Sequence, residues 1–219
     1  MRGEAGVHRR GARGGEGLDT GAVVQPYLVK WSATWQGRLT LTVGVMFLGL
    51  LGYFLVNGLR PARLDLYTPV DHAIPFIPAT LVLYHSYYIL PLAVAVAAEP
   101  AHFLRMVRAA VPVVVVTFVC FLFVPAEFPR PAWEAAGPRW GPAFQWLHTM
   151  DGPANTFPSL HVAITALAWA CTWRWRTRWF WTAWATLVVL STLTTKQHFV
   201  ADVVGGVVIA LAANRWASR

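Results

Sequence analysis

Two short segments of the chain carry the residues best suited to chemistry. The first runs from Pro158 through Ser159 to His161, and the second contains His198 and Asp202. His198 and Asp202 are four residues apart, so on a helix they would share one face. The carboxylate would then accept a hydrogen bond from one ring nitrogen and leave the other free to act as a nucleophile or a general base. We therefore expect both residues to be catalytic.

The surroundings of the two histidines favour an anionic ligand. Pro158 and Ser159 are typical of a helix start, where free backbone N–H groups and a partial positive charge attract anions such as phosphate. Lys196 adds a full positive charge two residues before His198. Two alternatives remain open. Two His and one Asp are also ligands for zinc, although Lys196 opposes a cation, and His198 and Asp202 also suit a purely structural helix pair.

Six apolar stretches must position these segments. Hydrophobic residues make up 56% of the 219 residues and charged residues only 13%, whereas about a quarter of an ordinary soluble domain is charged. Each stretch is close to the roughly 17–25 residues that cross a bilayer as a helix. The stretches cover residues 39–59, 80–98, 107–124, 159–175, 179–195 and 199–216. The sequence therefore predicts an all-α, polytopic membrane protein with six transmembrane helices.

The N-terminal residues differ from the rest of the chain. Residues 1–37 are rich in Gly and Arg and contain no apolar core, so we predict a disordered, basic cytoplasmic tail. Residues 38–219 would form the membrane catalytic domain. The tail lacks the apolar middle region of a signal peptide, and we expect no cleavage there.

Charge predicts the orientation of the helices. Most of the 18 Lys and Arg residues fall in the tail and in loops on one side of the six stretches. The positive-inside rule then places both termini in the cytoplasm and both histidine segments at the outer face, and we expect the plasma membrane. The net charge of +8 is thus explained by orientation, so membrane lipids rather than nucleic acid are the expected partners. The sequence does not indicate an oligomeric state.

The two histidine segments together resemble the type 2 phosphatidic acid phosphatase superfamily. The matching residues are Pro158-Ser159-Leu160-His161, then Ser191, with His198 seven residues later and Asp202 four beyond. The resemblance covers roughly residues 65–212 and implies that family's helical bundle. It is greatest to the branch of lipid phosphotransferases that includes inositol phosphorylceramide synthases, on residues 155–163 and 195–202.

The resemblance implies a mechanism. His198 would attack phosphorus and form a phosphohistidine, while Asp202 fixes the tautomer of its ring. His161 would protonate the leaving oxygen and then activate water or an acceptor alcohol. The substrate would be a lipid phosphate, and neither a metal nor another cofactor is implied.

The chain departs from the family pattern at its phosphate-binding cations. The phosphatase branch has a Lys seven residues before an Arg-Pro pair, but Tyr53 stands seven residues before Arg60 here. Thr192 stands where that branch has an Arg. Lys196 is therefore the leading substitute, with Arg63 a weaker one. The expected phosphate- or substrate-binding residues are Lys196, Ser159, Asn155, Asp71, Tyr84 and Tyr88, although Asp71 also suits a solvated loop carboxylate.

Three functions follow from these residues. The leading one is a metal-independent lipid phosphate phosphatase or phosphotransferase that works through a phosphohistidine. The second is a transferase similar to inositol phosphorylceramide synthase, which moves a phospho-headgroup onto a lipid alcohol. The third is a non-catalytic membrane protein or transporter that reuses the fold. The residues do not decide whether water or an alcohol is the acceptor.

Overall fold

The computed structural model describes residues 27–57, 59, 64–153 and 155–219. Regular structure in these ranges is helical, apart from an isolated β-bridge between Leu64 and Ala126. The predicted all-α class is confirmed for this part of the chain. Most of the segment predicted as a disordered tail, residues 1–26, lies outside the described residues. Of its remainder, residues 27–32 and 35–37 are helical.

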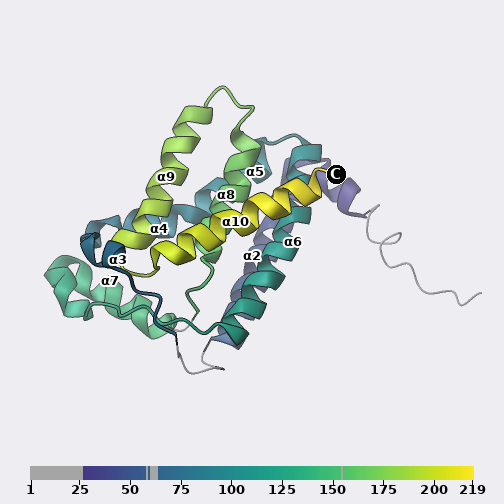
Figure 1. Ribbon diagram of the computed structural model, residues 1–219. Coiled ribbons are helices and arrows are strands. Elements are labelled where there is room, and N and C mark those ends of the chain that lie inside the picture. Colours follow the sequence, from purple (N-terminus) through teal and green to yellow (C-terminus); the bar gives the residue numbers. More distant parts are fainter. Residues whose placement is uncertain (1–26, 58, 60–63, 154) are drawn as a thin grey trace, which may run out of the picture.

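The helices follow one another along the chain, and the longer connections lie between α2 and α3 and on either side of α7 (Figure 1). Three 3₁₀ turns separate some of them, at Pro78–Thr80, Ser86–Tyr88 and Trp133–Ala136. The α-helices are α2 (Trp35–Val56), α3 (Pro69–Ala73), α4 (Leu81–His85), α5 (Ile89–Ala97), α6 (Pro100–Phe123), α7 (Gly137–Met150), α8 (Leu160–Thr172), α9 (Arg178–Thr194) and α10 (Val200–Ala217).

Four helical segments of the described chain are long and apolar enough to cross a membrane. They are Trp35–Val56, Pro78–Ala97, Pro100–Phe123 and Val200–Ala217. The other two predicted spans also form helices, but α8 has 13 residues and α9 has 17. At a rise of 1.5 Å per residue, α8 is only about 20 Å long, less than the roughly 30 Å of hydrocarbon. The structure therefore supports a membrane protein with four such helices.

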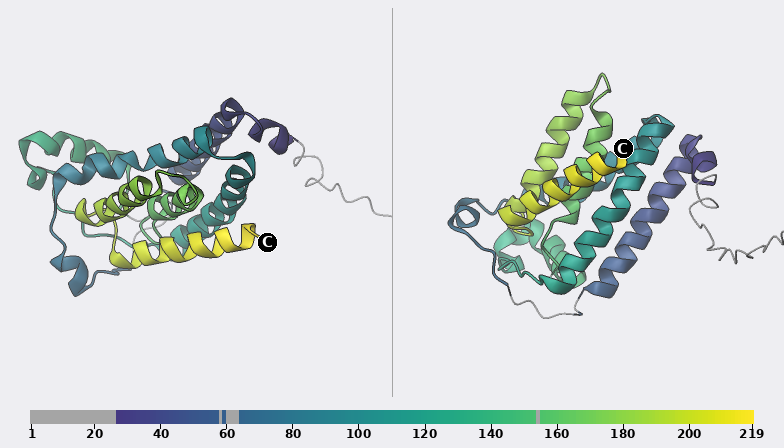
Figure 2. Two further views of the ribbon diagram at one scale, coloured as in Figure 1. Left: turned by 90° about the horizontal axis from the view of Figure 1, so that it is seen from above. Right: turned by 45° about the vertical axis from the view of Figure 1, so that its right-hand side comes forward.

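The core of the bundle is formed by α5, α6, α8 and α10. Helix α10 packs against α8 and α6, and α8 also contacts α5, α6 and α9. Small residues dominate this core, among them Ala109, Ala163, Ala168 and Ala210, and they allow the helix backbones to approach closely. Helix α2 lies beside α6 at the edge of the bundle (Figure 2) and leaves most of its apolar side chains exposed.

Helix α7 lies in a segment that the sequence analysis treated as a loop. It buries Phe144 and Leu147 against Leu81 and Tyr84 at the beginning of the second apolar segment. Helix α7 forms no continuous apolar stretch, because it mixes polar and apolar residues and contains Pro142. Helix α7 therefore covers the end of the bundle at which α8 and α10 begin (Figure 1).

Candidate active site

His198 and Asp202 are in contact, although not on one helix face as the sequence suggested. His198 lies just before the N-cap residue of α10, Phe199, and Asp202 occupies the first turn of the helix. The Asp202 carboxylate folds back, so that Oδ2 lies 3.1 Å from His198 Nδ1 and accepts a hydrogen bond of 3.0 Å from the Phe199 N–H. The side chain therefore orients the ring and caps the helix at the same time.

This pair is shielded from solvent. Asp202 is fully buried and His198 is 6% exposed. Because Nδ1 is engaged by the carboxylate, Nε2 is the nitrogen of His198 that remains for a substrate. A buried, oriented imidazole with one free nitrogen is suited to nucleophilic attack or to proton abstraction.

His161 approaches the pair from α8. Ser159 caps this helix by accepting a hydrogen bond of 3.3 Å from the Val162 N–H, as the sequence suggested. The Ser159 N–H also donates to the Asp202 carbonyl oxygen at 3.1 Å, so the beginnings of α8 and α10 are joined directly. The ring centroids of His161 and His198 are 5.7 Å apart. Two segments separated by more than thirty residues thus form one site.

Two tyrosines enclose the ring of His161. Tyr84 stacks on it with a centroid distance of 4.5 Å and an interplanar angle of 27°. Tyr87 approaches to 4.3 Å at 57°. Tyr88, which the sequence analysis singled out with Tyr84, packs on Tyr87 at 3.8 Å. Sequence reasoning missed Tyr87, and its three-residue spacing from Tyr84 was the available signal.

Asp71 lies at the site, but its carboxylate is bonded to the chain itself. It is 2% exposed. Oδ1 accepts a hydrogen bond of 2.7 Å from the Val200 N–H at the start of α10, and Oδ2 accepts bonds from the backbone and hydroxyl of Thr68 at 2.9 and 2.5 Å. These contacts make Asp71 a cap for both α3 and α10, a role that the expected substrate contact did not include.

The Lys196 side chain is held by the segment that contains Asp71. Its Nζ donates a hydrogen bond of 2.7 Å to the Asp71 carbonyl oxygen, and the residue is 8% exposed. Burial lowers the pKa of the Lys196 ammonium below its usual range, while the negative charge of Asp71 opposes this shift. The backbone of Lys196 has a φ of 57°, a left-handed conformation that is uncommon outside Gly and Asn and costs on the order of 1 kcal/mol. This turn sets the direction of the chain between the end of α9 and His198.

The two helix starts differ in their free N–H groups. At α10 the N–H groups of Phe199 and Val200 are bonded to the carboxylates of Asp202 and Asp71, so that of the first two helical residues only Ala201 keeps an N–H with no acceptor among the described residues. At α8 the N–H groups of the first two residues, Leu160 and His161, have no acceptor among the described residues. The start of α8 is therefore the better place for an anion.

A second polar cluster ties the segment before α8 to its neighbours. Arg130 forms an ion pair of 3.1 Å with Asp151 and donates to the Asp151 and Gly152 carbonyl oxygens. The Tyr53 hydroxyl of α2 donates to the same Asp151 carboxylate. The sequence analysis assigned no role to these residues, because they are distant in sequence and follow no shared motif.

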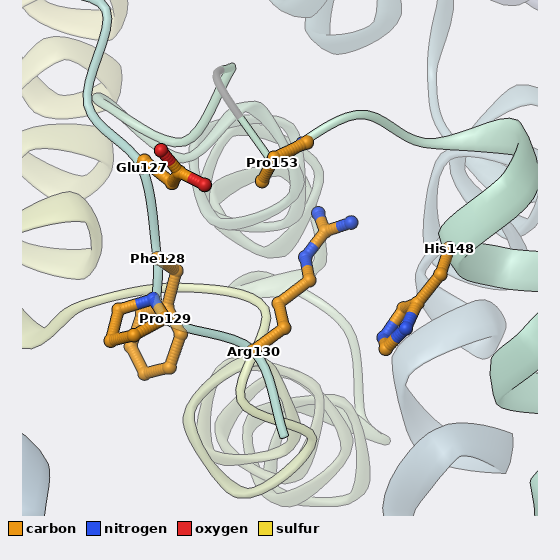
Figure 3. A pocket seen from close by; sticks show the side chains of 6 residues that line it. All are labelled: Glu127, Phe128, Pro129, Arg130, His148 and Pro153. Atoms are coloured by element: carbon orange, nitrogen blue, oxygen red, sulfur yellow. The ribbon is translucent and has the colours of Figure 1, made fainter. Parts of the chain in front are cut away.

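Asn155 and a small cavity lie next to this cluster. The Asn155 side chain donates a hydrogen bond of 3.5 Å to Asn57 Oδ1 and forms none with His161 or His198. Arg130, His148 and Glu127 line a cavity of about 330 Å³, in which the Arg130 side chain extends between Pro153 and His148 (Figure 3). Burial and the charge of Arg130 lower the pKa of His148, against the opposing effect of Asp151.

Other candidate ligands can be placed only in part. Arg63, the weaker candidate for a phosphate-binding cation, and Arg60 lie outside the described residues. Within the described ranges, no group of three His, Cys, Asp or Glu side chains is arranged to hold a metal ion.

Comparison with known proteins gives one match. The sequence model of the PAP2 superfamily matches residues 70–216, which include both histidine segments and most of the described helices. No curated protein and no solved structure was found to match the chain.

Proposed function

Because the chain belongs to the PAP2 superfamily, we propose that it is a membrane enzyme that hydrolyses or transfers the phosphoester of a lipid through a phosphohistidine. Members of this superfamily are in general phosphatases or phosphotransferases. The observation that carries the proposal is the contact of 3.1 Å between His198 Nδ1 and Asp202 Oδ2, with the ring centroid of His161 5.7 Å from that of His198.

In the first step Nε2 of His198 attacks phosphorus. An N–P bond forms, the bond from phosphorus to the leaving oxygen breaks, and His161 gives its proton to that oxygen. Asp202 holds the Nδ1–H of His198 and stabilises the positive charge that the ring acquires. The free N–H groups of Leu160 and His161 at the start of α8 suit the phosphoryl oxygens.

In the second step His161, now neutral, removes a proton from water or from an acceptor alcohol. The resulting oxygen attacks phosphorus, the N–P bond breaks, and His198 is regenerated. Both acceptors use the same residues, so the product depends on whether water reaches the phosphohistidine.

A transferase similar to inositol phosphorylceramide synthase is the second candidate. It is favoured by the burial of the site, since His198 is 6% exposed and Tyr84 is 3% exposed. A buried phosphohistidine would be protected from water until an alcohol arrived.

We also propose that all six predicted segments cross the membrane, with both termini in the cytoplasm, the site at the outer face and the plasma membrane as location. The short helix α8 would be extended by residues 155–159. Four of these five residues are buried, and non-helical backbone is tolerated at membrane depth where protein covers it. Residues 38–219 would then form the catalytic domain.

The experiment compares purified protein in phosphatidic acid vesicles with its His198→Ala variant. Transfer of ³²P from labelled phosphatidic acid to the wild-type protein, stable to base and labile to acid, is the expected result, and the variant should acquire no label. His102→Ala is the matched control, because His102 lies on α6 and pairs only with Glu99 among described acidic residues.

Product analysis separates the candidates. Free phosphate indicates a phosphatase, whereas a new phospholipid in vesicles supplied with a lipid alcohol indicates a transferase. Turnover that survives in His198→Ala would show that the nucleophile is wrong. Absence of both label and turnover in the wild-type protein would favour the non-catalytic alternative.

A further inference from the structure

The ring of His161 lies between two tyrosines, and neither has a role in the two chemical steps above. We infer that Tyr87, together with Tyr84, is a positioning residue that clamps the imidazole of His161 and favours its cationic form when the leaving oxygen is protonated. The inference rests on the proposed function, since it concerns the acid in the first step.

The local backbone explains why both rings meet the same imidazole. Helix α4 ends at His85, and a 3₁₀ turn at Ser86–Tyr88 follows before α5 begins. In a 3₁₀ turn, side chains three residues apart lie almost above one another. Tyr84 lies at the end of α4 and Tyr87 in the 3₁₀ turn, and residues three apart are also neighbours on an α-helix, so both rings reach the same imidazole. Tyr88 is one position further along and packs on Tyr87.

The contacts place the two rings close enough to act on charge. The centroid distances from His161 are 4.5 Å to Tyr84 and 4.3 Å to Tyr87. A cation within about 6 Å of an aromatic face is attracted by the negative face of the ring. The attraction is larger for imidazolium than for neutral imidazole, so it contributes where His161 must carry a proton.

His161 needs this support because its other neighbours oppose a positive charge. The ring of His198 lies 5.7 Å away and becomes cationic when it attacks phosphorus. The Asp202 carboxylate contacts His198 rather than His161. Among described residues, no carboxylate forms an ion pair or hydrogen bond with the His161 side chain, so the aromatic faces are its closest favourable electrostatic contacts.

The ratio of the rates with a poor and a good leaving group tests the role of Tyr87. A merely structural role of Tyr87 would not change this ratio. Phenoxide is a poor leaving group and benefits from protonation by His161, whereas p-nitrophenoxide leaves without a proton. The value of kcat/KM reports the steps up to release of the phenol, so it isolates the first step from attack by water. A variant in which His161 is less often protonated should lose activity on phenyl phosphate and keep it on p-nitrophenyl phosphate.

The experiment measures kcat/KM for both esters with the wild-type protein, Tyr87→Leu, Tyr87→Phe and His161→Ala. For Tyr87→Leu we expect a loss of about tenfold with phenyl phosphate and of less than about twofold with p-nitrophenyl phosphate. Tyr87→Phe keeps the aromatic face and should retain the wild-type ratio. Tyr27→Leu, at a position that is 65% exposed and distant in sequence from the site, controls for loss of a tyrosine.

Each outcome identifies what fails. An equal loss on both esters in Tyr87→Leu, or no loss on either, would overturn the inference, provided that His161→Ala changes the ratio. If His161→Ala leaves the ratio unchanged, the assignment of His161 in the proposed function fails instead. A ratio that changes equally in Tyr87→Phe and Tyr87→Leu would assign the effect to the hydroxyl and would also overturn the inference.

Discussion

Replacement of Asp71 by Ala separates two interpretations of this carboxylate. From the sequence, Asp71 is a substrate-binding residue or a solvated loop carboxylate. In the structure it is 2% exposed, and its oxygens accept hydrogen bonds from the Val200 N–H and from the backbone and hydroxyl of Thr68. If Asp71 serves to cap these helices, Asp71→Ala should lower the stability of the protein and not only its affinity for substrate.

The expected loss of stability can be worked out from the contacts. Loss of a capping residue costs on the order of 1 kcal/mol, and Asp71 caps both α3 and α10. A hydrogen bond to a charged group contributes about 1.5–3 kcal/mol, which applies to the 2.7 Å bond from Val200. We expect a total loss of about 3 kcal/mol. For a chain of this length that lowers the melting temperature by roughly 6–12 °C.

The assay is thermal unfolding of the detergent-solubilised protein, followed by tryptophan fluorescence, with KM measured in parallel at low temperature. Asp65→Ala is the matched control, because Asp65 is exposed and accepts one local bond of 2.8 Å from the Tyr67 N–H. It should shift the melting temperature by no more than about 2–3 °C. A wild-type melting temperature in Asp71→Ala, together with a raised KM, would refute the capping argument and favour substrate binding.

Three further predictions concern packing, catalysis and pH. Gly206→Ala would place its Cβ 2.6 Å from the Ser159 carbonyl oxygen, so it should lower both activity and melting temperature, whereas Gly44→Ala meets nothing within 4 Å and should lower neither. Asp202→Asn keeps the shape of the carboxylate but not its charge, and rapid-quench measurement should find phosphohistidine formation slower by about 10²-fold; an unchanged rate would contradict the role of Asp202. The lowered pKa of His148 means that the unfolded chain binds a proton at this residue before the folded chain does. The free energy of unfolding should therefore fall as the pH falls below about 6.5, and denaturant titrations should show a smaller fall in His148→Gln.

That the two histidine segments lie close together was predictable from their positions along the chain. Two histidine segments at the ends of apolar stretches imply one shared membrane face, and in the structure the rings of His161 and His198 are 5.7 Å apart. Ser159 caps α8 because a hydroxyl before a helix has few better partners. Local patterns of this kind need no knowledge of distant contacts.

The remaining parts depend on contacts that a local pattern does not contain. His198 and Asp202 meet although His198 precedes the helix, because the carboxylate folds back to the Phe199 N–H. Asp71 caps a helix that begins 129 residues later. Helix α7 mixes polar and apolar residues, and its burial depends on Leu81 and Tyr84 from another segment. Such partners are set by the packing of the whole bundle.

These distant contacts also determine which positive groups of the site are free to bind an anion. The positive groups nearest His198 are already engaged, because the Lys196 ammonium donates to the Asp71 carbonyl oxygen and the Phe199 and Val200 N–H groups donate to carboxylates. The net charge of +8 therefore says little about this site. The free N–H groups at the start of α8 are fixed in position by the helix and favour an anion. Recognition of a phosphoryl group would then depend on the alignment of Ser159 with Asp202, the contact that joins α8 to α10 and brings His161 to His198.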